Sequence, residues 1–218
     1  MRRAAVLGKG ALAAHACDVI ARLPGTLLDT VIPTTPEPQW DISLTGYVTE
    51  RWPEARIVAS GDWRELEPGR CDLVFSVLYD KIIGESLIEA TPHIINCHPG
   101  PLPEYRGARP VNWALHNHEH RHGITIHTID PGIDSGPVLA QAGFTIWPDH
   151  DEVKDVWARA MAYGRLLISD ALPRLERITP RPQDASRAIT HYSRDNGALG
   201  ERGDWIRETS VGPSVTGG

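Results

Sequence analysis

The fold is decided by the stretch IINCHPGPLPEYRG, residues 94–107, in which a short apolar run stops at a proline-rich turn. If residues 94–98 form a strand, its alternation places Asn96 and His98 on one face and Cys97 on the other. Pro99 has no N–H to donate and cannot continue a central strand. His98 is therefore predicted at the end of a strand, where open α/β sheets bind their ligands.

Other short apolar runs precede this stretch and alternate with segments that can form helices. The runs cover residues 4–7, 27–32, 57–59 and 73–78, and residues 11–23 can form a helix that Pro24 and Gly25 end. Short strands that alternate with helices usually form parallel sheets with both faces covered. The expected fold class is therefore α/β, with a mostly parallel, Rossmann-like sheet and helices on both faces.

The second half of the chain has a different pattern. Residues 123–130 alternate, and residues 138–146 follow a turn rich in Gly, Pro and Asp, which predicts two further strands. From Asp151, apolar residues recur at helical spacing, which predicts a long amphipathic helix that Asp149 or Asp151 caps and that ends before Pro180. We expect a catalytic domain at 1–180, a short C-terminal extension at 181–208 and a disordered tail at 209–218.

Composition excludes several classes of protein. With 22 Lys+Arg against 28 Asp+Glu, the net charge of -6 argues against nucleic acid as the main ligand. No run approaches the roughly 18 apolar residues of a membrane span, and the apolar start is too short for a secretory signal. The three scattered cysteines are expected to be thiols in a reducing compartment. These features predict a cytoplasmic protein with no membrane or nucleic-acid partner.

Two segments together carry side chains suited to acyl transfer. Residues 130–137, DPGIDSGP, form a tight loop that can bring Asp134 against the imidazole of His98. Asn96 and a protonated His98 can donate hydrogen bonds to the oxyanion that forms when an amine attacks a formyl carbon. Asp134 can orient His98, favour its charged form and help to relay the proton that the amine loses. The substrate amine is itself the nucleophile, so none is needed from the protein.

Five ordered motifs resemble the signature of the folate-dependent formyltransferase family. They are Asn96-Cys97-His98-Pro99, Leu102-Pro103, Tyr105-Arg106-Gly107, residues 123–127 (GITIH) and residues 130–137. The resemblance is good over residues 73–147 and only general over the first 70. It implies the formyltransferase fold, 10-formyltetrahydrofolate as the formyl donor, and Asn96, His98 and Asp134 as the catalytic residues.

The resemblance also implies where the two substrates bind. Residues 78–83 (LYDKII) are similar to the family's pterin-binding segment. The predicted folate-binding residues are Tyr79, Asp80, Lys81, Ile83, Asp130 and Gly132, and the predicted acceptor-binding residues are Tyr105, Arg106 and Gly107. No metal ligand is implied.

The C-terminal part of the chain narrows the expected acceptor. Methionyl-tRNA formyltransferases carry a further C-terminal domain, for which few residues follow the predicted long helix. Residues 191–194 (HYSR) and 203–206 (GDWI) look similar to the segment after the core helix of sugar N-formyltransferases, which are commonly dimers. We therefore expect a nucleotide-linked amino sugar as the acceptor and a possible homodimer. Transfer to an amino acid or antibiotic precursor, hydrolysis of 10-formyltetrahydrofolate, and folate binding without catalysis are the alternatives.

Two other patterns have both a functional and a structural interpretation. Residues 8–13 (GKGALA) fit G-x-G-x-x-A after a strand, and Asp29 stands where a dinucleotide fingerprint has an acidic residue. Tight strand-to-helix turns also select glycine for backbone reasons, and we favour that interpretation. His116, His118, His120 and His122 alternate, but without a complete ligand set they are expected in a solvated surface turn. His93 and His127 are expected to be packed, hydrogen-bonded histidines.

Overall fold

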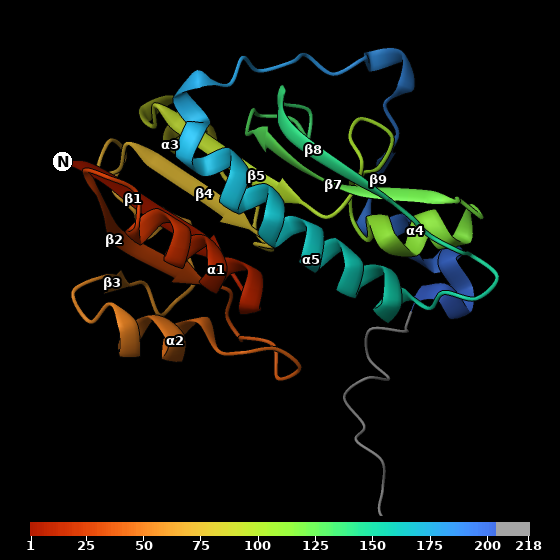
Figure 1. Ribbon diagram of the computed structural model, residues 1–218, viewed down its shortest axis with the longest axis horizontal. Coiled ribbons are helices and arrows are strands. Elements are labelled where there is room, and N and C mark those ends of the chain that lie inside the picture. Colours follow the sequence, from red (N-terminus) through yellow and green to blue (C-terminus); the bar gives the residue numbers. More distant parts are fainter. Residues whose placement is uncertain (204–218) are drawn as a thin grey trace, which may run out of the picture.

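The structure is a computed structural model that describes residues 1–203 (Figure 1). Within them, a seven-stranded sheet has the order β3-β2-β1-β4-β5-β7-β8. Its strands are β1 (Arg2–Gly8), β2 (Thr26–Pro33), β3 (Arg56–Ile57), β4 (Leu73–Val77), β5 (His93–His98), β7 (Arg121–Thr128) and β8 (Val138–Thr145). The expected tail at 209–218 and the GDWI residues 204–206 lie outside the described residues.

The sheet changes direction at β5. The strands β1 to β5 pair in parallel, whereas β7 runs antiparallel to β5 and β8 antiparallel to β7. The strand order reverses between β1 and β4, so the chain leaves the sheet in opposite directions after these neighbouring strands. Ligands bind at such a switch point in open α/β sheets. The mostly parallel α/β fold is thus confirmed.

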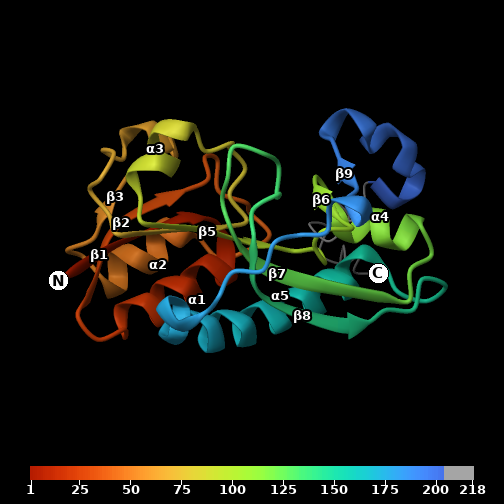
Figure 2. The same ribbon diagram turned by 90° about the horizontal axis from the view of Figure 1, so that it is seen from above.

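Helices cover both faces of the sheet (Figure 2). They are α1 (Gly10–Ala21), α2 (Leu44–Arg51), α3 (Glu85–Ala90), α4 (Pro110–His116), α5 (Val153–Ala171) and the 3₁₀ helices η1 (Trp63–Glu65), η2 (Leu172–Arg177), η3 (Ala185–Arg187) and η4 (Ser193–Gly203). The helices α1, α2 and α5 share a core with Val6, Phe75 and Cys97. The neighbouring residues Leu7 and Val74 point the opposite way, toward α3 and η1, as the alternation of a strand requires.

The N-cap of the long helix α5 is Glu152, not Asp149 or Asp151 as expected from the sequence. Glu152 forms a reciprocal capping box with Asp155. Asp151 instead pairs with Arg159 at 2.5 Å and accepts the backbone N–H of Trp147 at 2.7 Å. Asp151 therefore anchors the turn that enters the helix.

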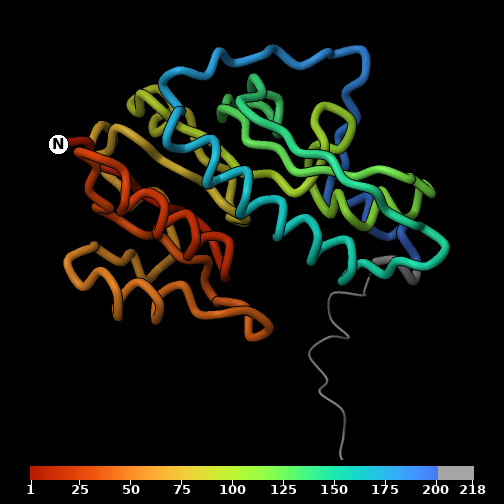
Figure 3. Tube along the Cα trace, in the orientation of Figure 1, coloured from red at the N-terminus to blue at the C-terminus, as the bar shows by residue number. Residues whose placement is uncertain are grey.

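The segment after η2 runs back along the molecule to the far end of the sheet (Figure 3). There the short strand β9 (Thr190–His191) pairs in parallel with β6 (Arg106–Gly107). Leu199 of η4 joins a third core with residues of α4, α5 and the end of β8. The start of the expected C-terminal extension is thereby packed against the loop that follows β5.

The three cysteines are thiols in the interior of the protein. Cys17, Cys71 and Cys97 are free and buried, and burial raises the pKa of the Cys97 thiol to about 12. Between residues 1 and 203, no helix is both long and apolar enough to cross a bilayer.

Gly164 lets α5 approach the sheet and α1 closely. A Cβ at this position would lie 2.8 Å from Cδ1 of Ile124 and 3.2 Å from both Cδ atoms of Leu12. We expect Gly164→Leu to lower the free energy of unfolding by about 1–3 kcal/mol through overpacking, measured by urea denaturation. Gly197→Ala is the control, because no atom lies within 4 Å of a Cβ there. Equal stability of Gly164→Leu and wild type would contradict this packing.

Candidate active site

The candidate site lies at the carboxyl ends of β1, β4 and β5. The strand β5 holds Asn96 and His98 on the face opposite Cys97, which belongs to the core beneath α1 and α5. Antiparallel pairing with β7 sets Asn96 opposite His127 and His98 opposite Thr125. The predicted amide and imidazole thus lie beside each other at the end of a central strand.

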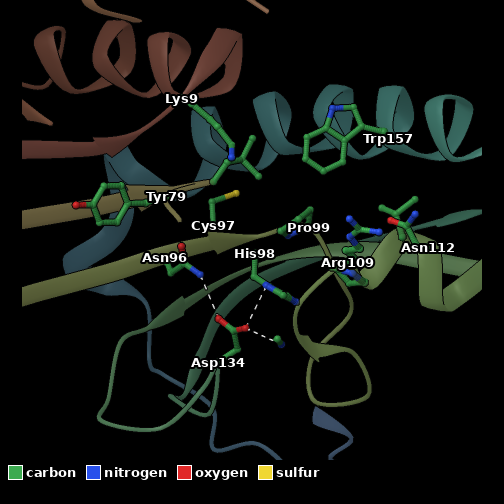
Figure 4. A pocket seen from close by; sticks show the side chains of 14 residues that line it. Lys9, Tyr79, Asn96, Cys97, His98, Pro99, Arg109, Asn112, Asp134 and Trp157 are labelled. Carbon is green, nitrogen blue, oxygen red and sulfur yellow. Dashed lines mark hydrogen bonds and ion pairs between the residues drawn. The ribbon is translucent and has the colours of Figure 1, made fainter. Parts of the chain in front are cut away.

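Asp134 reaches these residues from the loop between β7 and β8 (Figure 4). Its carboxylate oxygens lie 3.3 Å from Nδ2 of Asn96 and 3.4 Å from Nδ1 of His98. Asp134 has φ +46°, and its Oδ2 accepts the backbone N–H of Gly107 at 2.8 Å. The structure therefore brings the predicted trio together, while the roles of the three residues remain predictions.

The imidazole of His98 is buried between two protein oxygens. Its Nε2 lies 2.6 Å from the carbonyl oxygen of Tyr105, which can only accept, so we assign a proton to Nε2. Burial lowers the pKa of His98, although Asp134 opposes this shift. The lowered pKa favours the neutral ring, whereas the Asp134 carboxylate favours the protonated His98 expected from the sequence, which stays a prediction. In the neutral ring, Nδ1 is a basic nitrogen beside a carboxylate.

The carboxylate of Asp134 remains charged despite its burial. Burial acts to raise its pKa, but His98, His127 and the Gly107 amide outweigh burial and hold the pKa well below the usual range. A charged acceptor therefore faces Nδ1 of His98 near neutral pH. A proton that arrives between these two groups can be shared by both.

His127 is a site residue that the sequence interpretation assigned to packing. It is buried, and its Nδ1 lies 2.8 Å from the carbonyl oxygen of Thr128, which places the ring proton on Nδ1. Its Nε2 is then free to accept from Nδ2 of Asn96 at 3.2 Å and lies 3.4 Å from Oδ1 of Asp134. His127 thus orients the amide. The alternation of residues 123–130 placed His127 on a strand, but only pairing with β5 brings it to Asn96.

Two cavities meet at the trio. The smaller cavity, of 340 Å³, is bordered by Lys9, Arg109 and Trp157 among others, and the larger cavity has a volume of 540 Å³. Both are bordered by Tyr79, Asn96, Gly107 and Asp134. A group held at the trio is therefore accessible from both sides.

The predicted folate-binding residues all border the larger cavity. They are Tyr79, Asp80, Lys81, Ile83, Asp130 and Gly132. The hydroxyl of Tyr79 and the ammonium of Lys81 both donate to the carbonyl of Gly61, at 2.7 Å each, which fixes this wall. Asp130 is fixed by Ser135, whose hydroxyl donates to it at 2.7 Å. Their contact with folate remains a prediction.

Of the three predicted acceptor-binding residues, only one borders either of the two cavities. Gly107 borders both cavities, but neither Tyr105 nor Arg106 borders either one. The buried Tyr105 donates its hydroxyl hydrogen to Glu119 at 2.8 Å. Arg106 donates from Nε and Nη2 to Oε1 of Gln183, at 3.0 and 2.8 Å. Both side chains therefore support the loop around the site, and their contact with an acceptor stays a prediction.

Gln183, which carries no motif signal, ties this loop to the loop that carries Asp134. Its Nε2 donates to the carbonyl oxygens of Asp134 at 2.8 Å and Gly136 at 2.7 Å, while its Oε1 accepts from Arg106. One amide therefore satisfies three groups on segments that are distant in the chain. No local pattern could reveal this role, because Gln183 lies 49 residues from Asp134.

The GKG turn has the structural function that its glycines suggested. A Cβ on Gly8 would lie 2.0 Å from the carbonyl oxygen of Val77. Asp41 accepts the N–H of Ala11 at 3.0 Å and occupies the start of α1, where a pyrophosphate would bind in a dinucleotide site. Asp29 lies in the middle of β2, where it pairs with Arg70 at 2.8 Å, and it borders neither cavity. These contacts argue against a dinucleotide at this turn.

The four alternating histidines divide into two groups. His116, His118 and His120 are exposed, as expected for a surface turn. His122 is buried, and its Nε2 lies 3.0 Å from the carbonyl oxygen of Pro99, so its expected exposure is wrong. The reason is that His122 is the second residue of β7 and its side chain is buried, not part of the preceding surface turn. Residues 1–203 contain no group of three or more side chains arranged to hold a metal ion.

Sequence comparison identifies the family. The family described as Formyl transferase matches residues 45–172, which is more than half of the chain, and the chain therefore belongs to the formyltransferase family. Methionyl-tRNA formyltransferase of Geobacter metallireducens is 35% identical over 150 residues, which make up 66% of this chain and 46% of that protein. The Anaeromyxobacter dehalogenans enzyme is 32% identical over 199 residues, or 85% and 63% of the two chains. The chain thus spans less than two thirds of these relatives.

Solved structures share the fold. An N-formyltransferase from Helicobacter canadensis, in complex with folinic acid and dTDP-3-aminofucose, has a TM-score of 0.76 at 23% identity, with 89% of this chain and 72% of that one covered. Phosphoribosylglycinamide formyltransferase from Bacillus halodurans has a TM-score of 0.67 at 22% identity, with 80% and 95% covered. At these identities the likeness establishes the fold alone.

The buried ring of His122 should make the stability of the fold depend on pH. Burial lowers the pKa of His122 from its ordinary 6.5 to about 4. The unfolded chain therefore binds a proton below about pH 6.5 that the folded chain refuses until about pH 4. We expect this residue to remove about 3 kcal/mol of stability as the pH falls through that window. Urea denaturation across the window measures the loss.

The variant His122→Gln provides the comparison, because its amide does not titrate. Its stability should fall less steeply over the same window than that of the wild type. The loss of stability due to Asp134 has a separate, more acidic window, because its lowered pKa keeps it charged until lower pH. Parallel pH profiles for wild type and His122→Gln would contradict the assignment of His122 as a buried neutral ring.

Proposed function

We propose that the chain transfers a formyl group from 10-formyltetrahydrofolate to a primary amine, and that the amine belongs to a nucleotide-linked amino sugar. The observation that carries the proposal is that Asn96 and Asp134 border both cavities, while His98 beside them borders the smaller one. A transfer reaction needs two substrates that approach one set of reacting groups from different sides. Membership of the formyltransferase family supports the same chemistry.

The larger cavity suits the folate donor. Its volume of 540 Å³ lies in the range of small-molecule sites. Carboxylates of Asp80 and Asp130 border it and can accept from the N–H groups of a pterin. His191 also borders it, and Nε2 of His191 is buried without a hydrogen-bond partner among the described residues. A bound ligand with a polar edge would satisfy that nitrogen. The donor supplies the activated formyl carbon.

The trio can act on an amine that enters from the smaller cavity. Asn96 donates to Asp134 and contacts His127 through long bonds of 3.3 and 3.2 Å, so a formyl oxygen can compete for one amide hydrogen. That donor would stabilise the negative charge that gathers on the oxygen during attack. The new C–N bond forms as the bond from carbon to the folate nitrogen breaks.

The histidine–aspartate pair can manage the proton in this reaction. Nδ1 of neutral His98 is unprotonated and faces Asp134, so it can receive the proton that the amine nitrogen loses. The charge of Asp134 stabilises the imidazolium that results. The departing folate nitrogen needs one proton, so the proton count is balanced when His98 returns it.

The acceptor class is supported by the lining of the smaller cavity and by the fold relatives. Lys9 and Arg109 provide positive charge there, and Trp157 provides a ring. The Helicobacter canadensis relative was crystallised with an amino sugar linked to a nucleotide, and a second relative, WlaRD, is described as a sugar 3N-formyl transferase.

Substitution of the trio tests the mechanism. We expect Asn96→Ala, His98→Asn and Asp134→Ala each to lower formyl transfer by about a hundredfold or more, because each removes a transition-state donor or the proton acceptor. Formylated product should be measured by mass spectrometry with a panel of nucleotide-linked amino sugars, and thermal unfolding should verify the fold.

Matched controls are available on the surface. His120→Asn and Asp149→Ala alter exposed residues of the same types and should retain full turnover. Near-wild-type turnover in all three trio variants would contradict the mechanism. Release of formate without any amine, at the rate of the best acceptor, would instead identify a hydrolase.

Gln183 is expected to act as a positioning residue. Gln183→Leu removes both donations to the 134–136 backbone and should lower kcat about tenfold, because a small misplacement of Asp134 weakens proton transfer. The KM for the folate donor should change little. Gln183→Glu keeps the acceptor for Arg106 but loses the donor to the loop, so it should resemble Gln183→Leu. Wild-type kcat in both variants would show that the hydrogen bonds of Gln183 do not position Asp134.

A further inference from the structure

The lysine of the GKG turn has a place in the site that the proposed mechanism does not use. Lys9 follows β1 and borders the smaller cavity, and its side chain extends over this cavity, above Asn96 and Cys97 (Figure 4). Within residues 1–203, no hydrogen bond or ion pair involves its ammonium group. The turn therefore presents a cation to the cavity.

The start of α1, which follows Lys9, is already occupied by the carboxylate of Asp41. Oδ1 of Asp41 accepts the amide of Ala11, and Oδ2 of Asp41 would lie 2.1 Å from a Cβ on Gly10. The carboxylate therefore neutralises the start of α1 and would repel an anion there. An anion attracted to this part of the site would bind at the Lys9 side chain, on the cavity side of the turn.

The two cavities differ in charge. The smaller cavity is bordered by the cations Lys9 and Arg109, and its only carboxylate among the described residues is Asp134, which the trio and Gly107 already engage. The larger cavity is bordered by Lys81 and by the carboxylates Asp80, Asp130 and Asp134. A phosphate group is therefore attracted to the smaller cavity.

An aromatic wall stands across the smaller cavity from Lys9. Trp157 of α5 borders the cavity, and Figure 4 shows its ring facing the same space as Lys9. Trp40, from the segment between β2 and α2, contacts Trp157 edge-on, with centroids 6.2 Å apart and planes at 80°. This contact fixes the tryptophan in a position where its face can pack against a flat or cyclic group.

We infer that Lys9 and Trp157 form the acceptor-recognition subsite, in which Lys9 binds a phosphate of the acceptor and Trp157 packs against one of its rings. The inference deepens the proposed function and rests on it, because it assigns the smaller cavity to the acceptor. An acceptor held there presents its amine to the trio at the cavity floor. A nucleoside diphosphate linked to an amino sugar carries both features, a phosphate and a ring.

Binding of UDP, followed by isothermal titration calorimetry, tests this subsite without any need for turnover. We expect Lys9→Met to weaken UDP binding about tenfold, because it removes a charge-assisted hydrogen bond. Lys9→Arg should retain most of the affinity. Trp157→Leu should weaken UDP binding as well, with thermal unfolding as a check that α5 stays folded. Raising the salt concentration should weaken wild-type binding more than that of Lys9→Met.

Lys154→Met is the matched control, because Lys154 lies on α5 outside both cavities and pairs with Glu152. Its UDP affinity should equal that of the wild type. Equal UDP affinity of wild type and Lys9→Met would overturn the inference, and so would the absence of wild-type binding at millimolar UDP.

Two further measurements separate this inference from the proposed function. Binding of folinic acid to Lys9→Met should match the wild type, because Lys9 does not border the larger cavity. If the wild type formylates amino sugars and Lys9→Met keeps the same acceptor KM, the subsite is wrong and the formyl transfer stands. If UDP binding depends on Lys9 but no amine is formylated, the proposed function fails and the phosphate subsite stands.

Discussion

The carboxylate of Asp134 is the point at which the separate parts of the site meet. One oxygen accepts the Gly107 amide and faces His98, and the other faces Asn96 and His127. These contacts join β5, β7, β6 and the loop before β8. Because a buried carboxylate is costly unless its oxygens are satisfied, the segments that supply its partners must lie close to it. Gln183 adds a second constraint by holding the backbone of the same loop from the far end of the chain.

The direction of the strands explains why these segments can meet. Parallel strands β1, β4 and β5 end at one edge of the sheet, and the reversal of strand order between β1 and β4 opens space there. The antiparallel return through β7 then lays His127 beside Asn96, and the 130–137 loop that follows β7 places Asp134 against Asn96 and His98.

Electrostatics distinguishes the two sides of the trio. The lysine of the first turn and Arg109 make the smaller cavity cationic, whereas carboxylates predominate around the larger one. Burial lowers the pKa of His98, while the neighbours of Asp134 lower the pKa of its carboxyl group and keep it charged. The site therefore holds an imidazole, a carboxylate and an amide between a cationic and an acidic cavity. This separation of charge is a physical reason for two different substrates to approach from opposite sides.

The sequence by itself determined the class of fold and indicated the three side chains that meet at the end of β5. Apolar runs bounded by turns indicated the strands, Pro99 indicated the end of β5, and alternation set Asn96 and His98 on one face, because these features depend only on neighbouring residues. Tertiary structure decided the rest. The role of His127 follows from a register with a strand about 30 residues away, that of Gln183 from a return of the chain, and the inward position of Tyr105 from its packing beneath α4. The lowered pKa of His98 follows from burial, which depends on contacts between distant segments that no local pattern encodes.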